Sequence, residues 1–238
     1  MRRVAGLIRL LTAALFTVGV AVTAITGNLL DRRRGRVFFW LARHWSRGVL
    51  WICGLRLIVR GRDLLKRSTN YVYVSNHASL FDIPVVTAAV PDNIRIVYKK
   101  ELEKIPIFGW NLRWGPYIAI DRGKRADALR SVEEAVRKIR EGDSVFLYAE
   151  GTRTQDGRLQ PFKRGAFNLA VKSGVPVVPL TINGTFRIMA KGSIAIRPGP
   201  VEVIFESPIP VNPQGGRDEE VRVMDEVHRA IAANYQNQ

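Results

Sequence analysis

His77 and Asp82 are the residues in this sequence whose types and spacing first suggest chemistry. They lie in the stretch YVYVSNHASLFDIP, residues 71–84, and His77 is one of only three histidines. A histidine held by a carboxylate keeps one tautomer and can act as a general base. The ordinary alternative is a loop histidine beside an aspartate that caps a helix, and these two residues alone favour that alternative. Five positions along a continuous α-helix place side chains about 140° apart, so a contact requires a turn or a helix start between them.

Three later stretches carry cations in positions that suit an anion. Residues 99–123, KKELEKIPIFGWNLRWGPYIAIDRG, place Lys99 and Lys100 before a Pro/Gly-rich turn and Arg122 after it, although a solvated loop would look the same. Residues 148–157, YAEGTRTQDG, end a predicted buried strand with a glycine, which lets the backbone approach a ligand, and an arginine, which can grip a phosphate with two hydrogen bonds. Lys163 and Arg164 begin a predicted helix, where an anion is favoured.

Strands alternate with helices from about Leu55 onward, which indicates an α/β layer fold with a mixed, largely central β-sheet flanked by helices. Two prolines in VPVVPL favour an edge strand or the beginning of a strand. A late hairpin is expected at 193–198 and 201–206, around Pro198-Gly199-Pro200. The other predicted strands are 55–61, 71–75, 95–100, 116–121, 144–149 and 175–182, and the predicted helices are 83–89, 124–140, 164–173 and 219–234.

The first quarter of the chain has the character of a membrane anchor. Leu10–Leu30 has 21 uncharged residues, enough to cross a hydrocarbon layer of roughly 30 Å. Val37–Val59 combines tryptophans with arginines, which is typical of a helix at a membrane–water boundary. We therefore expect residues 1–54 to form a helical hairpin partly sunk in one leaflet, joined to an α/β domain at 55–238. A single spanning helix and a cleaved signal peptide are the alternatives.

The charge is strongly positive, and its distribution narrows the choice of partner. The net charge is +16, and residues 1–66 hold thirteen basic residues against two acidic ones. Such a chain favours anionic partners: nucleic acid, an anionic membrane or a phosphorylated substrate. The aromatic residues gather in the apolar N-terminal part and not on a strand face, which disfavours nucleic acid. The single cysteine, Cys53, excludes an internal disulfide, and no metal site is indicated.

Taken together, four blocks in this order resemble the glycerolipid acyltransferase family. They are N-H-x4-D at Asn76–Asp82, the Lys99–Arg122 block, E-G-T-R at Glu150–Arg153 and V-P-V-V-P at Val175–Pro179. Each block alone is a weak signal, but four in order are specific, and the likeness covers roughly residues 55–210. Within the family the sequence is most similar to bacterial 1-acyl-sn-glycerol-3-phosphate acyltransferases.

The resemblance implies transfer of a fatty acyl group from acyl-CoA or acyl-carrier protein to the sn-2 hydroxyl of lysophosphatidic acid, making phosphatidic acid without a cofactor or metal. His77 would be the general base, and Asp82 would orient it and stabilise its cation. Arg153 is the first choice for the phosphate, and Glu150 would contact the glycerol or fix Arg153. The implied acceptor-binding residues are Lys100, Arg122, Glu150, Gly151, Thr152, Arg153 and Lys163.

The implied location is the cytoplasmic face of the cell inner membrane, bound to one leaflet or by a single span. The expected partners are anionic membrane lipids, lysophosphatidic acid and the acyl donor, with no nucleic acid. Another lysolipid, such as a lyso-ornithine lipid or lysophosphatidylethanolamine, is the nearest alternative acceptor. A membrane-attached relative without activity and a basic nucleic-acid binder are the alternatives of other classes.

Overall fold

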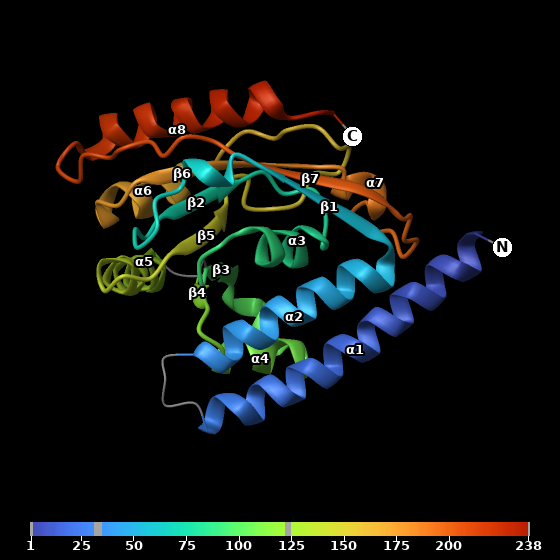
Figure 1. Ribbon diagram of the computed structural model, residues 1–238. Helices are drawn as coiled ribbons and strands as arrows, with labels where there is room; N and C mark the ends of the chain where they lie inside the picture. Colours follow the sequence, from blue (N-terminus) through green and yellow to red (C-terminus); the bar gives the residue numbers. More distant parts are fainter. Residues whose placement is uncertain (1, 31–34, 122–124, 238) are drawn as a thin grey trace.

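The centre of the molecule is a mixed sheet in which most neighbouring strands run parallel. The computed structural model describes residues 2–30, 35–121 and 125–237, and within them seven strands form one sheet in the order β1-β7-β6-β2-β5-β3-β4 (Figure 1). β6, β2, β5, β3 and β4 are parallel, whereas β7 is antiparallel to β6 and parallel to β1. The carboxyl ends of β6, β2, β5, β3 and β4 therefore share one edge. The bounds are β1 Leu55–Arg60, β2 Val72–Ser75, β3 Arg95–Lys99, β4 Ile118–Ile120, β5 Val145–Tyr148, β6 Val177–Asn183 and β7 Gly199–Phe205.

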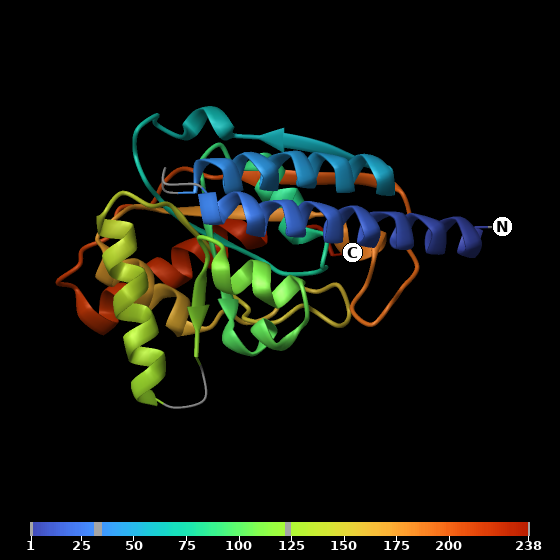
Figure 2. The same ribbon diagram turned by 90° about the horizontal axis from the view of Figure 1, so that it is seen from below.

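Helices cover both faces of this sheet and enclose two apolar cores. α5, α6 and α8 lie on one face, and α1 to α4 lie on the other (Figures 1 and 2). Successive residues of a strand point to opposite faces, so Tyr73 joins the core beneath α2 and α3 while Val72 and Val74 join the core beneath α5, α6 and α8. The helix bounds are α1 Arg2–Leu30, α2 Arg36–Cys53, α3 Asp82–Ala89, α4 Phe108–Trp114, α5 Arg125–Arg140, α6 Arg164–Ser173, α7 Thr185–Ile188 and α8 Gly216–Asn234, with 3₁₀ turns η1 Arg62–Leu64 and η2 Lys100–Lys104.

The two N-terminal helices pack against each other along one side of the molecule. They approach closely: a Cβ atom on Gly48 would lie 2.5 Å from the Phe16 ring. α1 buries small side chains on its inner side and leaves a stripe of larger apolar side chains exposed: Val4, Ile8, Leu11, Leu15, Val18 and Val22. Val4–Gly27 is long and apolar enough to cross a membrane. The predicted second helix was too long, because Gly54 adopts a left-handed conformation with φ of 70° and ends α2 at Cys53.

The predicted α/β fold is confirmed, but the predicted hairpin at 193–206 is wrong. Residues 193–198 form no strand, and β7 pairs with β1 and β6. Ile196 is buried in the core beneath α1, and the Arg197 N–H donates to the Ile188 carbonyl. The apolar alternation that suggested a strand therefore reflects one buried side chain in a loop.

The expectation that VPVVPL lies at a sheet edge or strand start holds only for Pro176, which directly precedes β6. Pro179 lies inside β6, between β7 and β2. Its carbonyl accepts a hydrogen bond from the Glu206 N–H, so Pro179 faces the side on which β7 has already ended at Phe205. The missing proline N–H therefore falls just beyond the β6–β7 register, which ends at the Leu180–Phe205 pair.

Gly184, between β6 and α7, should be intolerant of a side chain for two separate reasons. Its φ is +93°, and an added Cβ would lie 2.5 Å from the Pro200 carbonyl oxygen. Gly142 also has a positive φ, of +102°, but a Cβ there would meet nothing within 4 Å. Gly142→Ala should cost about 1–2 kcal/mol in the free energy of unfolding, from backbone conformation alone, and Gly184→Ala should cost at least about 1 kcal/mol more. Urea unfolding in detergent measures both, and equal losses would contradict the steric contribution.

Candidate active site

His77 and Asp82 meet at the carboxyl end of β2. His77 Nδ1 lies 2.7 Å from Asp82 Oδ2, and the Asp82 side chain is completely buried whereas that of His77 is 15% exposed. α3 begins at Asp82, so a turn lies between the two residues, as their spacing required. Because the carboxylate accepts the Nδ1 proton, the lone pair of neutral His77 lies on Nε2. This is the geometry of a general base with a fixed tautomer.

Asp82 does not cap the helix that it begins. No side chain caps the N-terminus of α3. Instead Asp82 Oδ2 accepts hydrogen bonds from the backbone N–H groups of Ala78 and Ser79, at 2.7 and 2.9 Å. The carboxylate thus holds the turn that carries His77 and holds the His77 ring at the same time. The ordinary alternative, an independent capping aspartate beside a loop histidine, does not describe this geometry.

Hydrogen bonds to other elements hold the His77 turn on both sides. Asn76 exchanges two hydrogen bonds with the backbone of Ile182 in β6. Glu150, at the end of β5, accepts the His77 N–H at 2.7 Å and the Gln160 N–H at 3.2 Å. The Thr154 N–H donates to the His77 carbonyl. The turn is therefore fixed by backbone contacts to segments far away in the sequence.

These contacts give Glu150 a different role from the one that the resemblance implied. Both of its oxygens are occupied by backbone N–H groups, and it is buried. No hydrogen bond or ion pair joins it to Arg153 in the described part of the chain. Burial, together with the charge of Asp82, raises the pKa of Glu150 to about 7, although its backbone hydrogen bonds oppose the rise. Glu150 braces the turn, and we assign it no contact with the acceptor.

Sequence reasoning missed two aromatic residues at this edge. The Tyr148 ring stacks on the His77 ring at 3.8 Å between centroids and 11° between planes. The Tyr235 hydroxyl, just after α8, donates to the Gly157 carbonyl in the loop that follows β5. An aromatic residue at the last position of a strand beside the histidine was the available signal for Tyr148. Nothing local predicts Tyr235, because the contact joins positions 78 residues apart.

Two cations at the turn after β5 lack a partner in the part of the chain that the structure describes. Arg153 is half-buried, Lys163 is exposed, and neither side chain forms a hydrogen bond or ion pair with a described residue. Gly151, with φ of +69°, lets the Lys163 side chain lie against the turn that carries Arg153: an added Cβ would lie 3.0 Å from Lys163 Cδ and 3.4 Å from Lys163 Nζ. Thr152 is exposed on the same turn. Free cations beside a left-handed glycine turn suit an anionic ligand.

The cations of the 99–123 block are placed differently. Lys100 begins η2, and its Nζ lies 3.1 Å from Asp121 Oδ2, while Lys99 pairs with Glu101 at 3.1 Å. β3 lies two strands from β2, so the start of η2 is roughly 10 Å from the His77 turn. Lys100 thus shares the edge but has an acidic partner. Arg122 lies outside the described residues.

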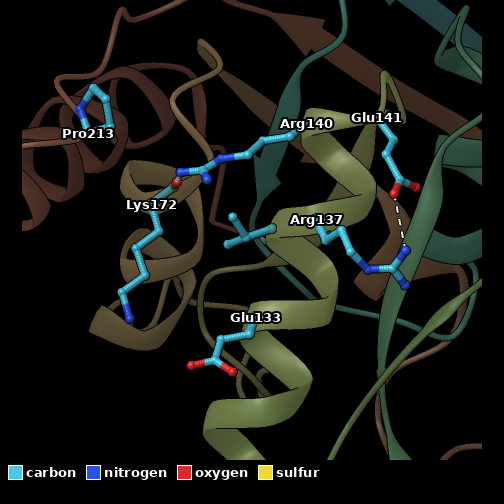
Figure 3. A pocket seen from close by; sticks show the side chains of 7 residues that line it. Glu133, Arg137, Arg140, Glu141, Lys172 and Pro213 are labelled. Carbon is cyan, nitrogen blue, oxygen red and sulfur yellow. Dashed lines mark hydrogen bonds and ion pairs between the residues drawn. The ribbon is translucent and has the colours of Figure 1, made fainter.

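The cavity drawn in Figure 3 belongs to the opposite edge of the sheet. It holds about 470 Å³ and lies where α5 and α6 lead into the amino ends of β5 and β6. Arg137 pairs with Glu141, and Arg140 donates to the Lys172 carbonyl. A larger cavity of about 820 Å³ is lined by Asn70, Asn93 and Ser144, which also precede strands. Neither cavity includes a predicted site residue.

The raised pKa of Glu150 predicts a pH-dependent stability. The folded protein holds the proton on Glu150 more tightly than the unfolded chain, whose carboxyl titrates near 4.5. The stabilisation is complete below pH about 4.5 and is lost as the pH rises through about 7. Relative to Glu150→Gln, the wild type should lose about 2–3 kcal/mol of unfolding free energy across this range. Urea unfolding at a series of pH values tests this, and a difference that does not vary with pH would show that Glu150 stays ionised.

Comparisons with known proteins identify the family of this chain. The model of a family described as Acyltransferase matches residues 56–183. A chloroplastic 1-acyl-sn-glycerol-3-phosphate acyltransferase of Brassica napus is 36% identical over 215 residues, 87% of this chain and 61% of that protein. A 1-acyl-sn-glycerol-3-phosphate acyltransferase of Limnanthes douglasii is 39% identical over 162 residues, 68% of this chain and 57% of that protein. The chain therefore spans less than two thirds of the length of these relatives.

The likeness extends to the whole tertiary structure. The crystal structure of the 1-acyl-sn-glycerophosphate (LPA) acyltransferase from Thermotoga maritima superposes with a TM-score of 0.83 at 26% identity, covering 99% of this chain and 96% of that one. The superposition includes the N-terminal helices as well as the sheet. By its sequence blocks, its family match and its fold, this chain belongs to the Acyltransferase family.

Proposed function

We propose that this chain transfers a fatty acyl group from a thioester donor to the sn-2 hydroxyl of 1-acyl-sn-glycerol 3-phosphate, forming phosphatidic acid. The observation that carries the proposal is the His77–Asp82 pair, at 2.7 Å, on the same sheet edge as Arg153, which has no partner among the described residues. The relatives named as 1-acyl-sn-glycerol-3-phosphate acyltransferases support this choice of acceptor. The donor is acyl-CoA or acyl-carrier protein.

In the proposed reaction His77 acts directly on the acceptor. Its Nε2 takes the proton of the sn-2 hydroxyl while that oxygen attacks the thioester carbonyl carbon. The C–O bond forms, the tetrahedral intermediate collapses, and the C–S bond breaks. The His77 imidazolium returns the proton to the leaving thiolate, which departs as the free thiol. Asp82 stabilises the imidazolium between these two steps, and the only cysteine, Cys53, is fully buried in α2.

Arg153 is the residue that we propose to bind the acceptor phosphate, with Lys163 beside it. Arginine holds a phosphate oxygen pair more specifically than lysine, because its N–H groups form a planar fork. Both side chains are free in the described part of the chain, so binding an anion breaks no existing ion pair. Lys100 is a weaker candidate, since its charge is already offset by Asp121.

We further propose that the protein lies on one leaflet, at the cytoplasmic face of the inner membrane, where both possible donors occur. Gly6, Ala13 and Ala24 of α1 all contact the rest of the protein. α1 therefore follows the body along its length, which supports an in-plane helix over a span. The division into a 1–54 anchor and a 55–238 catalytic domain stays a prediction.

The purified chain should acylate lysophosphatidic acid, and two substitutions should abolish the reaction. His77→Ala removes the base and should lower kcat by at least about a hundredfold. Asp82→Asn should cause a comparable loss because it disturbs the tautomer of His77. The assay measures phosphatidic acid formed with acyl-CoA and with acyl-carrier protein. Equal turnover of lysophosphatidylethanolamine would make the acceptor assignment wrong, and His77→Ala activity within tenfold of wild type would dismiss His77 as the base.

Arg153→Ala should mainly weaken binding of the acceptor. Loss of a charge-assisted contact to phosphate predicts a rise of about tenfold or more in the acceptor KM, with the donor KM nearly unchanged. Arg158→Ala is the matched control, since Arg158 lies in the same loop with a largely exposed side chain. A rise in the donor KM alone would place Arg153 at the other substrate, and an equal effect of both variants would point to a general loss of surface charge.

A further inference from the structure

We propose that the segment from Ile105 to Trp114 is a second membrane-contacting element, which places its tryptophans in the headgroup layer of an anionic bilayer beside α1. The inference rests on the proposed membrane association of this chain and extends it to the acyltransferase part. Residues 99–123 read from sequence as a basic stretch around a solvated turn. The structure instead places a helix there, α4, in which Phe108, Trp110 and Trp114 are exposed.

The outward side of this segment is unusually apolar. Trp110 is 48% exposed and Trp114 is 52% exposed, and their ring centroids lie 6.2 Å apart, as expected for residues four positions apart on one helix face. Ile105 and Phe108 are also exposed. Isolated exposed apolar residues are ordinary, but a contiguous aromatic cluster marks an interaction surface.

The inward side of α4 prevents the tryptophans from turning into the protein. Leu112 is buried, and a Cβ on Gly109 would lie 2.3 Å from the Glu103 carbonyl oxygen. α4 therefore presses its smallest residue against η2 and cannot rotate without losing that contact. The exposure of Trp110 and Trp114 is consequently a fixed feature of the fold, which leaves this surface available to a partner outside the chain.

The position of α4 identifies this partner as lipid. α4 packs against α1, and the two helices lie side by side on the same face of the molecule (Figures 1 and 2). α1 supplies Val4–Gly27, which is apolar enough for a membrane and has only 17% of its most apolar window buried. Lys104, directly before the segment, and Arg113, between the two tryptophans, are exposed and form no ion pair with a described residue. Tryptophan flanked by cations is the composition that the membrane interface favours.

This contact would set the depth of the reacting groups. η2 and α4 follow directly from the carboxyl end of β3, next to β5, whose end carries the Glu150–Arg153 turn. The Tyr148 ring that stacks on His77 packs against the core on the α1–α4 face. An acceptor whose acyl chain stays in the leaflet could then present its hydroxyl and phosphate to the site without leaving the membrane.

The experiment measures the depth of α4 in the full-length chain bound to phosphatidylcholine–phosphatidylglycerol vesicles. Trp110→Cys is labelled with a fluorophore, and Asp225→Cys, exposed on α8 at the other sheet face, is the matched control; the native Cys53 is buried. Lipids with a nitroxide near the headgroup should quench the label at position 110 and leave the label at 225 unquenched. Equal, weak quenching at both positions would overturn the proposal. The quenching measurement requires no catalytic turnover, so its result does not depend on whether the proposed substrate is correct.

A kinetic comparison tests the consequence for the reaction. The double variant Trp110→Ala/Trp114→Ala should acylate lysophosphatidic acid embedded in vesicles roughly tenfold more slowly than the wild type, because less apolar surface then binds this side of the protein to the bilayer. Its rate with acceptor dispersed in detergent should match that of the wild type. Equal loss in both conditions would mean that the tryptophans support folding or catalysis and not the membrane contact, and would overturn the proposal.

Discussion

Asp82 Oδ2 accepts three hydrogen bonds, from the His77 ring and from the backbone N–H groups of Ala78 and Ser79. The rest of the candidate site depends on this one buried oxygen. Burying a carboxylate costs free energy unless its oxygens accept hydrogen bonds. The hydrogen bonds from the turn and the ring therefore stabilise the buried carboxylate, and the same bonds fix the positions of the turn and the ring. The second oxygen, Oδ1, is buried without a partner in the described part of the chain. The carboxylate thus lies in contact with the ring that must become a cation in the proposed reaction.

The order of the strands places the other site residues near the His77–Asp82 contact. β2, β5 and β3 are parallel neighbours, so the His77 turn, the Glu150–Arg153 turn and Lys100 follow one another along one edge. β6, on the other side of β2, holds Asn76 through Ile182. The two faces of the sheet are covered differently. α5, α6 and α8 close one face, while the other carries the stacked His77 and Tyr148 rings beneath helices with exposed apolar side chains.

Much of the fold could be predicted, because periodicity reports burial directly. Strands buried on both faces appear as short apolar runs, and α5 and α6 end at glycines that stop a helix. The failures have a common cause. Ile196 and Pro179 were interpreted from their neighbours in sequence, but their conformations follow from α1 and from the end of β7. α4 was missed because its seven residues bury only Gly109 and Leu112, which leaves too short an apolar pattern to detect.

The sequence by itself determined the family, the order of the blocks and the pairing of a histidine with an aspartate, since these depend on residue types and on spacing along the chain. Only the tertiary structure decided what each group touches. Glu150 braces two loops, Lys100 pairs with Asp121, and Arg153 has no partner among the residues that the structure describes. The physical reason is that hydrogen bonds and ion pairs at this edge join segments up to 110 residues apart. Such partners are chosen by how the sheet brings strand ends together, and no local pattern records that choice.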